Sequence, residues 1–235
     1  MAKEVQSRLF PQRMPAIRTL SYAGQCIQAR QVGGDYYDFL DLGAGRLGLV
    51  VGDVAGKGFA AALLMASLQA NLRSQCALAR DDLAAMLISV NRLFYENTPD
   101  SSYATLFFAA YDDRSRRIRY VNCGHLPPLL LRREGAMDRL PATSTVLGLC
   151  ADWDCTIAET YLEPGDSLVI YTDGVTETLS DRGDEFGEPR LMSLSQANNR
   201  MRPEDLLQAV VNAVQSFSGR EREDDITLVV AQCRV

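Results

Sequence analysis

The strand-like segments of this chain come in pairs joined by tight turns, and this restricts the possible folds more than any other feature. The first such segments are residues 21–29, 34–42 and 45–52. The turn Gly43-Ala44-Gly45 between the last two is typical of a hairpin. A second hairpin spans residues 103–122 around a polar turn. Consecutive hairpins favour antiparallel sheets over a parallel sheet of alternating strands and helices.

The other periodic segments complete this fold class. Further apolar, strand-like runs are residues 126–131, 155–162, 167–171 and 226–230. The expected helices are residues 3–10, 58–79, 81–97 and 203–217, with Asp81 or Asp82 as a cap for the third. Two of these helices lie in the middle of the chain and one lies before the last strand. We therefore predict an α+β fold, a four-layer αββα sandwich of two antiparallel sheets flanked by helices.

The 235 residues are sufficient for one domain with a sizeable core. No repeat, low-complexity tract or internal linker is visible, so we expect one domain over residues 19–235, preceded by a helix and linker over residues 1–18. Pro11 and Pro15 end the short N-terminal helix. Because so short a helix is unstable in isolation, it must dock on the domain or on another chain.

Composition excludes several classes of function. The net charge of −6 argues against non-specific binding to nucleic acid, which needs clustered lysine and arginine. The six cysteines are scattered without a Cys-x-x-Cys pair, which favours small buried side chains in a reducing compartment. No run of eighteen apolar residues and no apolar core of a signal peptide is present, so a cytoplasmic protein without a membrane span is expected.

Four carboxylates share one local setting, the end of an apolar run beside glycine or a tight turn. They are Asp35, Asp53, Asp173 and Asp224. Each alone is more often structural, but four carboxylates gathered in space would repel one another strongly unless cations neutralised them. Carboxylates and carbonyls are hard oxygen ligands that suit Mg²⁺ or Mn²⁺. With one histidine in the chain, a His/Cys zinc site is poorly supported.

Five motifs around these residues resemble a known family. They are Val32-Gly33-Gly34-Asp35-Tyr36-Tyr37-Asp38, Gly52-Asp53-Val54-Ala55-Gly56-Lys57-Gly58, Asn122-Cys123-Gly124-His125-Leu126-Pro127-Pro128, Tyr171-Thr172-Asp173-Gly174-Val175-Thr176-Glu177 and Asp224-Asp225-Ile226-Thr227. In this order they resemble the successive motifs of the SpoIIE/RsbU-type phosphatases, the bacterial branch of the PPM (type 2C-like) metal-dependent serine/threonine phosphatases. Five motifs in sequence make the resemblance specific, although each alone would be weak.

The resemblance implies a site for two Mg²⁺ or Mn²⁺ ions at one end of a β-sandwich. By this resemblance, Asp53 would bridge the two ions and the carbonyl of Val54 would bind one of them. Asp173 and Asp224 would hold the other ion, and Asp35 would serve the pair directly or through water. Asp53 and Asp173 are the expected catalytic residues.

Other residues near the motifs have two interpretations each. Lys57 is either a phosphate or substrate contact or a solvated residue near the start of a helix. His125 has either a structural, hydrogen-bonding role or an acid–base role. By the resemblance, Asp225 is expected to support the site without binding a metal itself, and the sequence leaves open which of Asp224 and Asp225 is the direct ligand. Arg30 is close to Asp35 in sequence but is equally consistent with a surface residue. The sequence therefore leaves the general acid and the phosphate-binding arginine unassigned.

The function implied by the resemblance is hydrolysis of phosphoserine or phosphothreonine by a water activated between two metal ions. The substrate class implied is a small phosphorylated regulatory protein, such as an anti-sigma-factor antagonist. An activating partner and a homodimer formed through the N-terminal helix are compatible with the sequence. Two alternatives remain, namely a catalytically silent module of the same fold that binds a phosphoprotein or another partner, and a hydrolase of another phosphoester.

Overall fold

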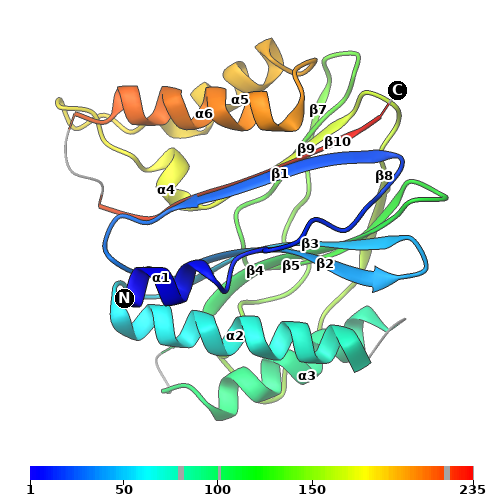
Figure 1. Cartoon of the computed structure of the whole chain (residues 1–235), viewed down its shortest axis with the longest axis vertical. Coiled ribbons are helices and arrows are strands. Elements are labelled where there is room, and N and C mark those ends of the chain that lie inside the picture. Colours follow the sequence, from blue (N-terminus) through cyan, green and yellow to red (C-terminus); the bar gives the residue numbers. More distant parts are fainter. Residues whose placement is uncertain (79–81, 100–101, 220–222, 235) are drawn as a thin grey trace.

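The computed structural model describes residues 1–78, 82–99, 102–219 and 223–234, which form two stacked sheets (Figure 1). The helices are α1 (Ala2–Ser7), α2 (Phe59–Leu78), α3 (Leu83–Glu96), α4 (Asp173–Thr176), α5 (Gly187–Ala197) and α6 (Pro203–Phe217). The strands are β1 (Leu20–Ile27), β2 (Asp35–Gly43), β3 (Arg46–Val54), β4 (Ala104–Asp112), β5 (Arg117–Cys123), β6 (Leu129–Leu131), β7 (Met137–Arg139), β8 (Ala158–Tyr161), β9 (Ser167–Tyr171) and β10 (Ile226–Cys233).

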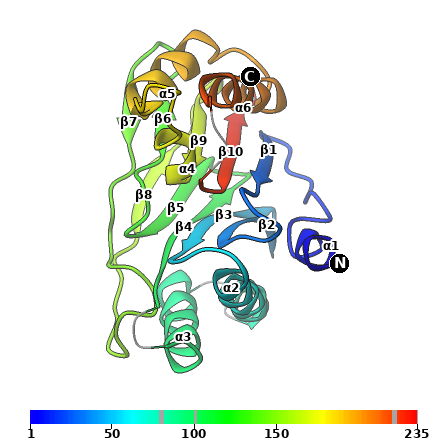
Figure 2. The same cartoon turned by 90° about the vertical axis from the view of Figure 1, so that its left-hand side faces the viewer.

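Both sheets are antiparallel and have five strands each, in the orders β1-β10-β9-β6-β7 and β2-β3-β4-β5-β8. Helices α2 and α3 cover the outer face of the second sheet, and α5 and α6 cover the outer face of the first (Figure 2). Apolar side chains from the two inner faces, such as Leu49, Phe107 and Val229, form the layer between the sheets. The predicted four-layer αββα sandwich is confirmed.

The first predicted hairpin is present and fixes the position of the site. Gly43 pairs with Arg46, so Ala44 and Gly45 form a two-residue turn with φ angles of 54° and 73°. Such left-handed angles match the twist of the flanking strands. Counting back along this register, Asp35 at the start of β2 lies directly opposite Asp53 near the end of β3.

Three elements were missed by the sequence analysis, namely α4, α5 and β7. Within α5 only Leu191 and Ser195 are buried, so the helix lacks the apolar periodicity that predicts a helix from sequence. Two predicted strands are shorter than expected, because β6 begins only after Pro127 and Pro128 and β8 covers only Ala158–Tyr161. Proline has no N–H to donate to a strand partner, which accounts for the late start of β6.

The helix boundaries follow local chemistry. Asp82 caps α3 by accepting a hydrogen bond of 3.0 Å from the Ala85 amide, as predicted, while the alternative cap Asp81 lies outside the described residues. Helix α1 ends at Ser7 rather than at residue 10.

The N-terminal helix docks on the domain itself. The side chain of Gln6 is buried, donates to the carbonyl of Gly33 (2.7 Å) and accepts from the Gly33 amide (3.1 Å). Leu9 and Phe10 pack against the core beneath α2, where Gln69 donates to the Leu9 carbonyl (3.2 Å). The segment before β1 therefore contacts the loop that carries Asp35.

Two expectations from composition bear on the fold. Within the described part of the chain, no helix has the length and apolar character required to span a membrane. All six cysteines are free thiols, and Cys76, Cys123 and Cys233 are buried while the other three are half-buried.

One ion pair joins α2 to the edge strand β2. Asp38 is fully buried, and its two carboxylate oxygens accept hydrogen bonds from Nε (2.7 Å) and Nη2 (2.9 Å) of Arg73. The Tyr36 hydroxyl (2.5 Å) and the Phe39 amide (2.8 Å) also donate to this carboxylate. Because a buried charge is tolerated only when it is paired and hydrogen-bonded, this network fixes α2 against the strand that begins with Asp35.

We predict that Arg73→Met lowers the free energy of unfolding by about 3 kcal/mol, because it leaves the buried Asp38 carboxylate without its cation. Urea denaturation measures this loss. The control is Arg202→Met, which breaks the exposed Arg202–Asp205 pair and should have a much smaller effect. Equal losses in the two variants would contradict a stabilising role for the Arg73–Asp38 pair.

His125 belongs to the packed interior. It is 4% exposed, its Nδ1 shares a hydrogen bond of 2.8 Å with Oγ1 of Thr105, and its amide donates to Oδ1 of Asn122 (2.8 Å). Burial lowers the pKa of His125 to about 4, and the backbone of Tyr171 opposes this shift only in part. The imidazole is therefore neutral at pH 7, in keeping with the structural interpretation.

We predict that His125 contributes to acid sensitivity. Its pKa is about 4 when folded and about 6.5 when unfolded. Its neutral form therefore contributes fully above about pH 6.5, and the contribution falls, by at most about 3 kcal/mol, as the pH drops toward 4. Urea denaturation of the native protein and His125→Gln at pH 7.0, 5.5 and 4.5 should show a difference that narrows as the pH falls. A difference independent of pH would contradict this assignment.

Candidate metal centre

The candidate site lies where the two sheets meet at one end of the sandwich. Asp35 and Asp53 come from β2 and β3 of one sheet, and their backbones pair directly. Asp173 and Asp224 come from the other sheet, because Asp173 follows β9 and Asp224 precedes β10. Strands β9 and β10 are neighbours, so their two loops lie together. The fold thus brings together all four carboxylates that the sequence singled out.

Hydrogen bonds orient the most buried of these carboxylates. Asp35 is 3% exposed, and Oδ2 accepts a bond of 2.8 Å from the hydroxyl of Thr172. Thr172 in turn accepts from the Thr227 amide at 3.0 Å. Thr172, the residue before Asp173, therefore links the Asp35 carboxylate to β10. This contact across the two sheets could not be read from the sequence.

Asp225 is packed between two glycines and ties the surrounding loops together. A Cβ at Gly33 would lie 1.5 Å from Oδ2 of Asp225, and a Cβ at Gly174 would lie 1.9 Å from its carbonyl oxygen, so no side chain fits at either position. The Asp225 carboxylate accepts from the amides of Ala29 (2.8 Å) and Asp35 (3.5 Å). Asp225 therefore joins the segment after β1 and the start of β2 to the start of β10, and it also lines the pocket described below.

Gly34 leaves the carbonyl of Val54 uncovered. A Cβ at Gly34 would lie 2.7 Å from the Val54 oxygen and 3.6 Å from Oδ1 of Asp53. The Val54 amide meanwhile donates to the Gly34 carbonyl at 3.3 Å. The carbonyl that the family resemblance implies as a metal ligand is thus beside Asp53 and free of side-chain obstruction from this loop.

The carboxylates strongly perturb one another. Burial, followed by the charges of Asp173, Asp224 and Asp225, raises the pKa of Asp53 to about 7. Burial and the neighbouring Asp53 raise the pKa of Asp35 well above its usual range, although the hydrogen bond from Thr172 lowers it in part. Burial and Asp224 also raise the pKa of Asp173. Negative charge is therefore concentrated here beyond what the described side chains neutralise.

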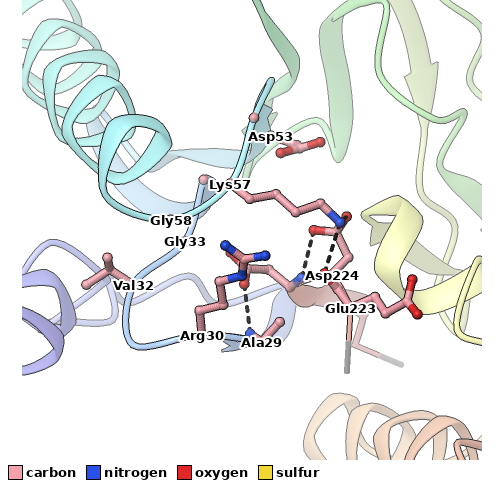
Figure 3. A pocket seen from close by; sticks show the side chains of 12 residues that line it. Ala29, Arg30, Val32, Gly33, Asp53, Lys57, Gly58, Glu223 and Asp224 are labelled. Carbon is pink, nitrogen blue, oxygen red and sulfur yellow. Dashed lines mark hydrogen bonds and ion pairs between the residues drawn. The ribbon is translucent and has the colours of Figure 1, made fainter. Parts of the chain in front are cut away.

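A pocket opens between these loops, and two cationic side chains line it (Figure 3). Lys57 crosses the pocket from the turn after β3, and its Nζ lies 2.7 Å from Oδ2 of Asp224 and donates to the Glu223 carbonyl at 2.9 Å. Arg30 extends into the pocket from the segment after β1. Its Nη1 lies 3.9 Å from the position that a Cβ on Gly58 would take. Within the described ranges, Arg30 has no hydrogen bond or ion pair with another residue.

The donor set suits hard divalent cations. Oxygens of carboxylates and carbonyls are the ligands that Mg²⁺ and Mn²⁺ prefer, and the raised pKa values of Asp35, Asp53 and Asp173 show how closely these carboxylates lie to other negative charges. Among the residues described, no three Asp, Glu, His or Cys side chains already converge into a metal cage. Binding would therefore require small side-chain movements, and Asp224 is the carboxylate already engaged by Lys57.

His125 lies behind the site rather than in it. Its hydrogen-bond partner Thr105 is the β4 residue paired with Asp53 of β3. The histidine can support the strand that flanks Asp53, but it does not line the pocket around Lys57.

Comparisons with known proteins identify the family of this chain. The family model described as Stage II sporulation protein E (SpoIIE) matches residues 43–234. Protein IcfG of Synechocystis sp. is 29% identical over 97% of this chain and 40% of its own length. Phosphoserine phosphatase RsbU of Bacillus subtilis is 27% identical over 100% of this chain and 70% of its own.

Among solved structures, that of the RsbU and RsbW domains of Rv1364c from Mycobacterium tuberculosis superimposes with a TM-score of 0.81. The sequences are 30% identical, and the match covers 94% of this chain and 62% of that one. This chain thus spans 40% and 62% of the lengths of IcfG and the mycobacterial protein. The chain belongs to the SpoIIE family, within the SpoIIE/RsbU-type branch of the PPM phosphatases, as its five motifs predict.

Proposed function

We propose that this chain is a metal-dependent phosphatase that hydrolyses phosphoserine or phosphothreonine in a protein. The observation that carries the proposal is the meeting of Asp35 and Asp53 from one sheet with Asp173 and Asp224 from the other. Asp53 and Asp224 line a pocket that Arg30 and Lys57 also line. A silent relative of the same fold would be expected to have lost part of this acidic set.

In this proposal the ligands of two Mg²⁺ or Mn²⁺ ions are Asp35, Asp53, Asp173, Asp224 and the carbonyl of Val54. When bound, such ions lower the pKa of water, so that hydroxide is available near neutral pH, and offset negative charge on phosphate. The residues of the chain hold the ions in place and align the phosphate with the attacking water, and no covalent phospho-enzyme is needed.

We infer that Arg30 is the phosphate-binding arginine that the sequence left unassigned. It lines the same pocket as Asp53 and Asp224, and its side chain has no hydrogen bond or ion pair in the described ranges. A guanidinium donates two parallel hydrogen bonds to phosphate oxygens, which gives both affinity and orientation. The amide of its neighbour Ala29 is fixed by Asp225, so the backbone that carries Arg30 is held against the site. Lys57 is a second candidate contact for phosphate.

The proposed substrate class is a small phosphorylated regulatory protein of the anti-sigma-factor antagonist type. It is supported by relatives called phosphoserine phosphatases, RsbU and RsbP of B. subtilis. An activating partner, a homodimer through α1 and a cytoplasmic location also remain proposals. Val5 of α1 and Leu63 of α2 are exposed apolar residues at which a partner or a second copy of the chain could pack.

We predict that phosphate release from a phosphoserine peptide requires Mn²⁺ or Mg²⁺ and that Asp53→Asn lowers kcat by at least about 100-fold, because the variant loses a charged ligand between the two ions. The measurement is phosphate release with each metal or with chelator. Asp152→Asn, which removes an exposed carboxylate outside the pocket, should keep full activity.

Three results would change this assignment. Hydrolysis that persists in chelator would contradict a metal-dependent reaction. If the protein hydrolyses an aryl phosphate but does not hydrolyse the phosphopeptide, another phosphoester is favoured as the substrate. Phosphopeptide binding without turnover under either metal would favour the silent binding module.

We predict that Arg30→Ala raises KM for the phosphopeptide about tenfold through loss of charge-assisted hydrogen bonds to phosphate. The Mn²⁺ concentration giving half-maximal activity should stay the same. Arg200→Ala, which removes an exposed arginine outside the pocket, is the matched control. An unchanged KM in Arg30→Ala would assign Arg30 to the surface instead.

A further inference from the structure

The ammonium group of Lys57 lies beside Asp224, one of the candidate metal ligands, where a metal ion would be expected. Its Nζ lies 2.7 Å from Oδ2 of Asp224 and 2.9 Å from the carbonyl of Glu223. The other carboxylate oxygen, Oδ1, accepts from the Asp225 amide at 2.9 Å. Both oxygens of Asp224 are therefore engaged, one by the backbone that follows it and one by Lys57 (Figure 3).

Lys57 and Asp224 come from segments that are far apart in sequence. Lys57 lies in the turn that follows β3, four residues after Asp53, while Asp224 lies just before β10. Their side chains are 46% and 41% exposed, so solvent reaches the pair and no buried network holds it together. A pair of this kind is weak enough to open at little cost.

We propose that Lys57 is a tethered counter-ion that competes with a divalent cation for Asp224. The inference rests on the proposed metal-dependent function. An ammonium group at hydrogen-bond distance from Oδ2 occupies the position from which that oxygen would coordinate a metal. Two cations beside one carboxylate repel each other, so binding of the metal by Asp224 expels Lys57.

The lysine side chain suits this exchange. Its charge sits at the end of a flexible four-carbon stem, so it can leave Asp224 without movement of the backbone. Once released, the ammonium group remains within the pocket lined by Arg30 and Asp53, where it can contact a phosphate group. The contact between Lys57 and phosphate would therefore become available only after Asp224 has taken a metal ion.

The chain offers a direct way to observe Lys57, because lysine occurs only at positions 3 and 57. Protein labelled with ¹³C and ¹⁵N lysine should give two sets of side-chain signals, and Lys57→Met identifies which is Lys57. We predict that titration with Mg²⁺ moves the Lys57 signals toward those of a solvated lysine, while the Lys3 signals stay unchanged. In metal-free protein, Asp224→Asn should produce the same shift.

Calorimetry supplies a second readout. Because removal of the competing charge leaves Asp224 open, Lys57→Met should bind Mg²⁺ and Mn²⁺ about fivefold more tightly than the native protein. Lys57→Arg, which restores a cation, should bind more weakly than Lys57→Met. Lys3→Met on α1 should match the native protein, and circular dichroism of each variant checks that the fold is intact.

The outcomes separate this inference from the proposed function. If Lys57→Met binds metal no more tightly, or Mg²⁺ leaves the Lys57 signals in place, while metal-dependent hydrolysis persists, the competition is wrong and the phosphatase assignment stands. If neither the native protein nor Lys57→Met binds Mg²⁺ or Mn²⁺ and no hydrolysis occurs, the competition and the phosphatase assignment are both wrong.

Discussion

Repulsion among carboxylates at one end of the sandwich is the constraint on which the site depends. Asp35, Asp53 and Asp173 all have raised pKa values, and in each case burial and a neighbouring carboxylate contribute. Such a cluster persists in a folded protein only when other interactions outweigh its cost. Packing of Asp225 against Gly33 and Gly174 holds the loops together despite that cost. The charge that remains is what suits the pocket to divalent cations.

Contacts behind the cluster extend this rigidity into the fold. The Arg73–Asp38 pair fixes α2 to β2, three residues after Asp35, and Gln6 of α1 holds the backbone of Gly33 from the other side. Both contacts hold the backbone on either side of Asp35 in place. The pocket is less tightly held than these buried contacts, because the ion pair of Lys57 and Asp224 that lines it is half-exposed to solvent. The site thus combines a hydrogen-bonded support with one half-exposed ion pair.

Much of the fold could be predicted because its signals are local. Hairpin turns, caps and apolar periodicity depend on residues close in sequence, so the hairpin at Gly43–Gly45, the Asp82 cap and helix α6 were found in the expected places. Helix α5 was missed because it buries few residues, and β6 is shorter than predicted because Pro127 and Pro128 have no N–H to donate to a neighbouring strand. Both differences have a local cause: α5 is only weakly amphipathic, and the two prolines remove backbone donors before β6.

For the candidate site, the sequence by itself determined the family, the four aspartates and the oxygen-rich chemistry, because each motif combines a carboxylate with glycine or a turn at the end of a strand. Only the tertiary structure decided how these residues meet. It placed His125 in the interior, brought Arg30 into the pocket and paired Lys57 with Asp224. These outcomes depend on which side chains converge from the two sheets and on how far each is buried. Neither property is encoded in the spacing of residues along a single strand or turn.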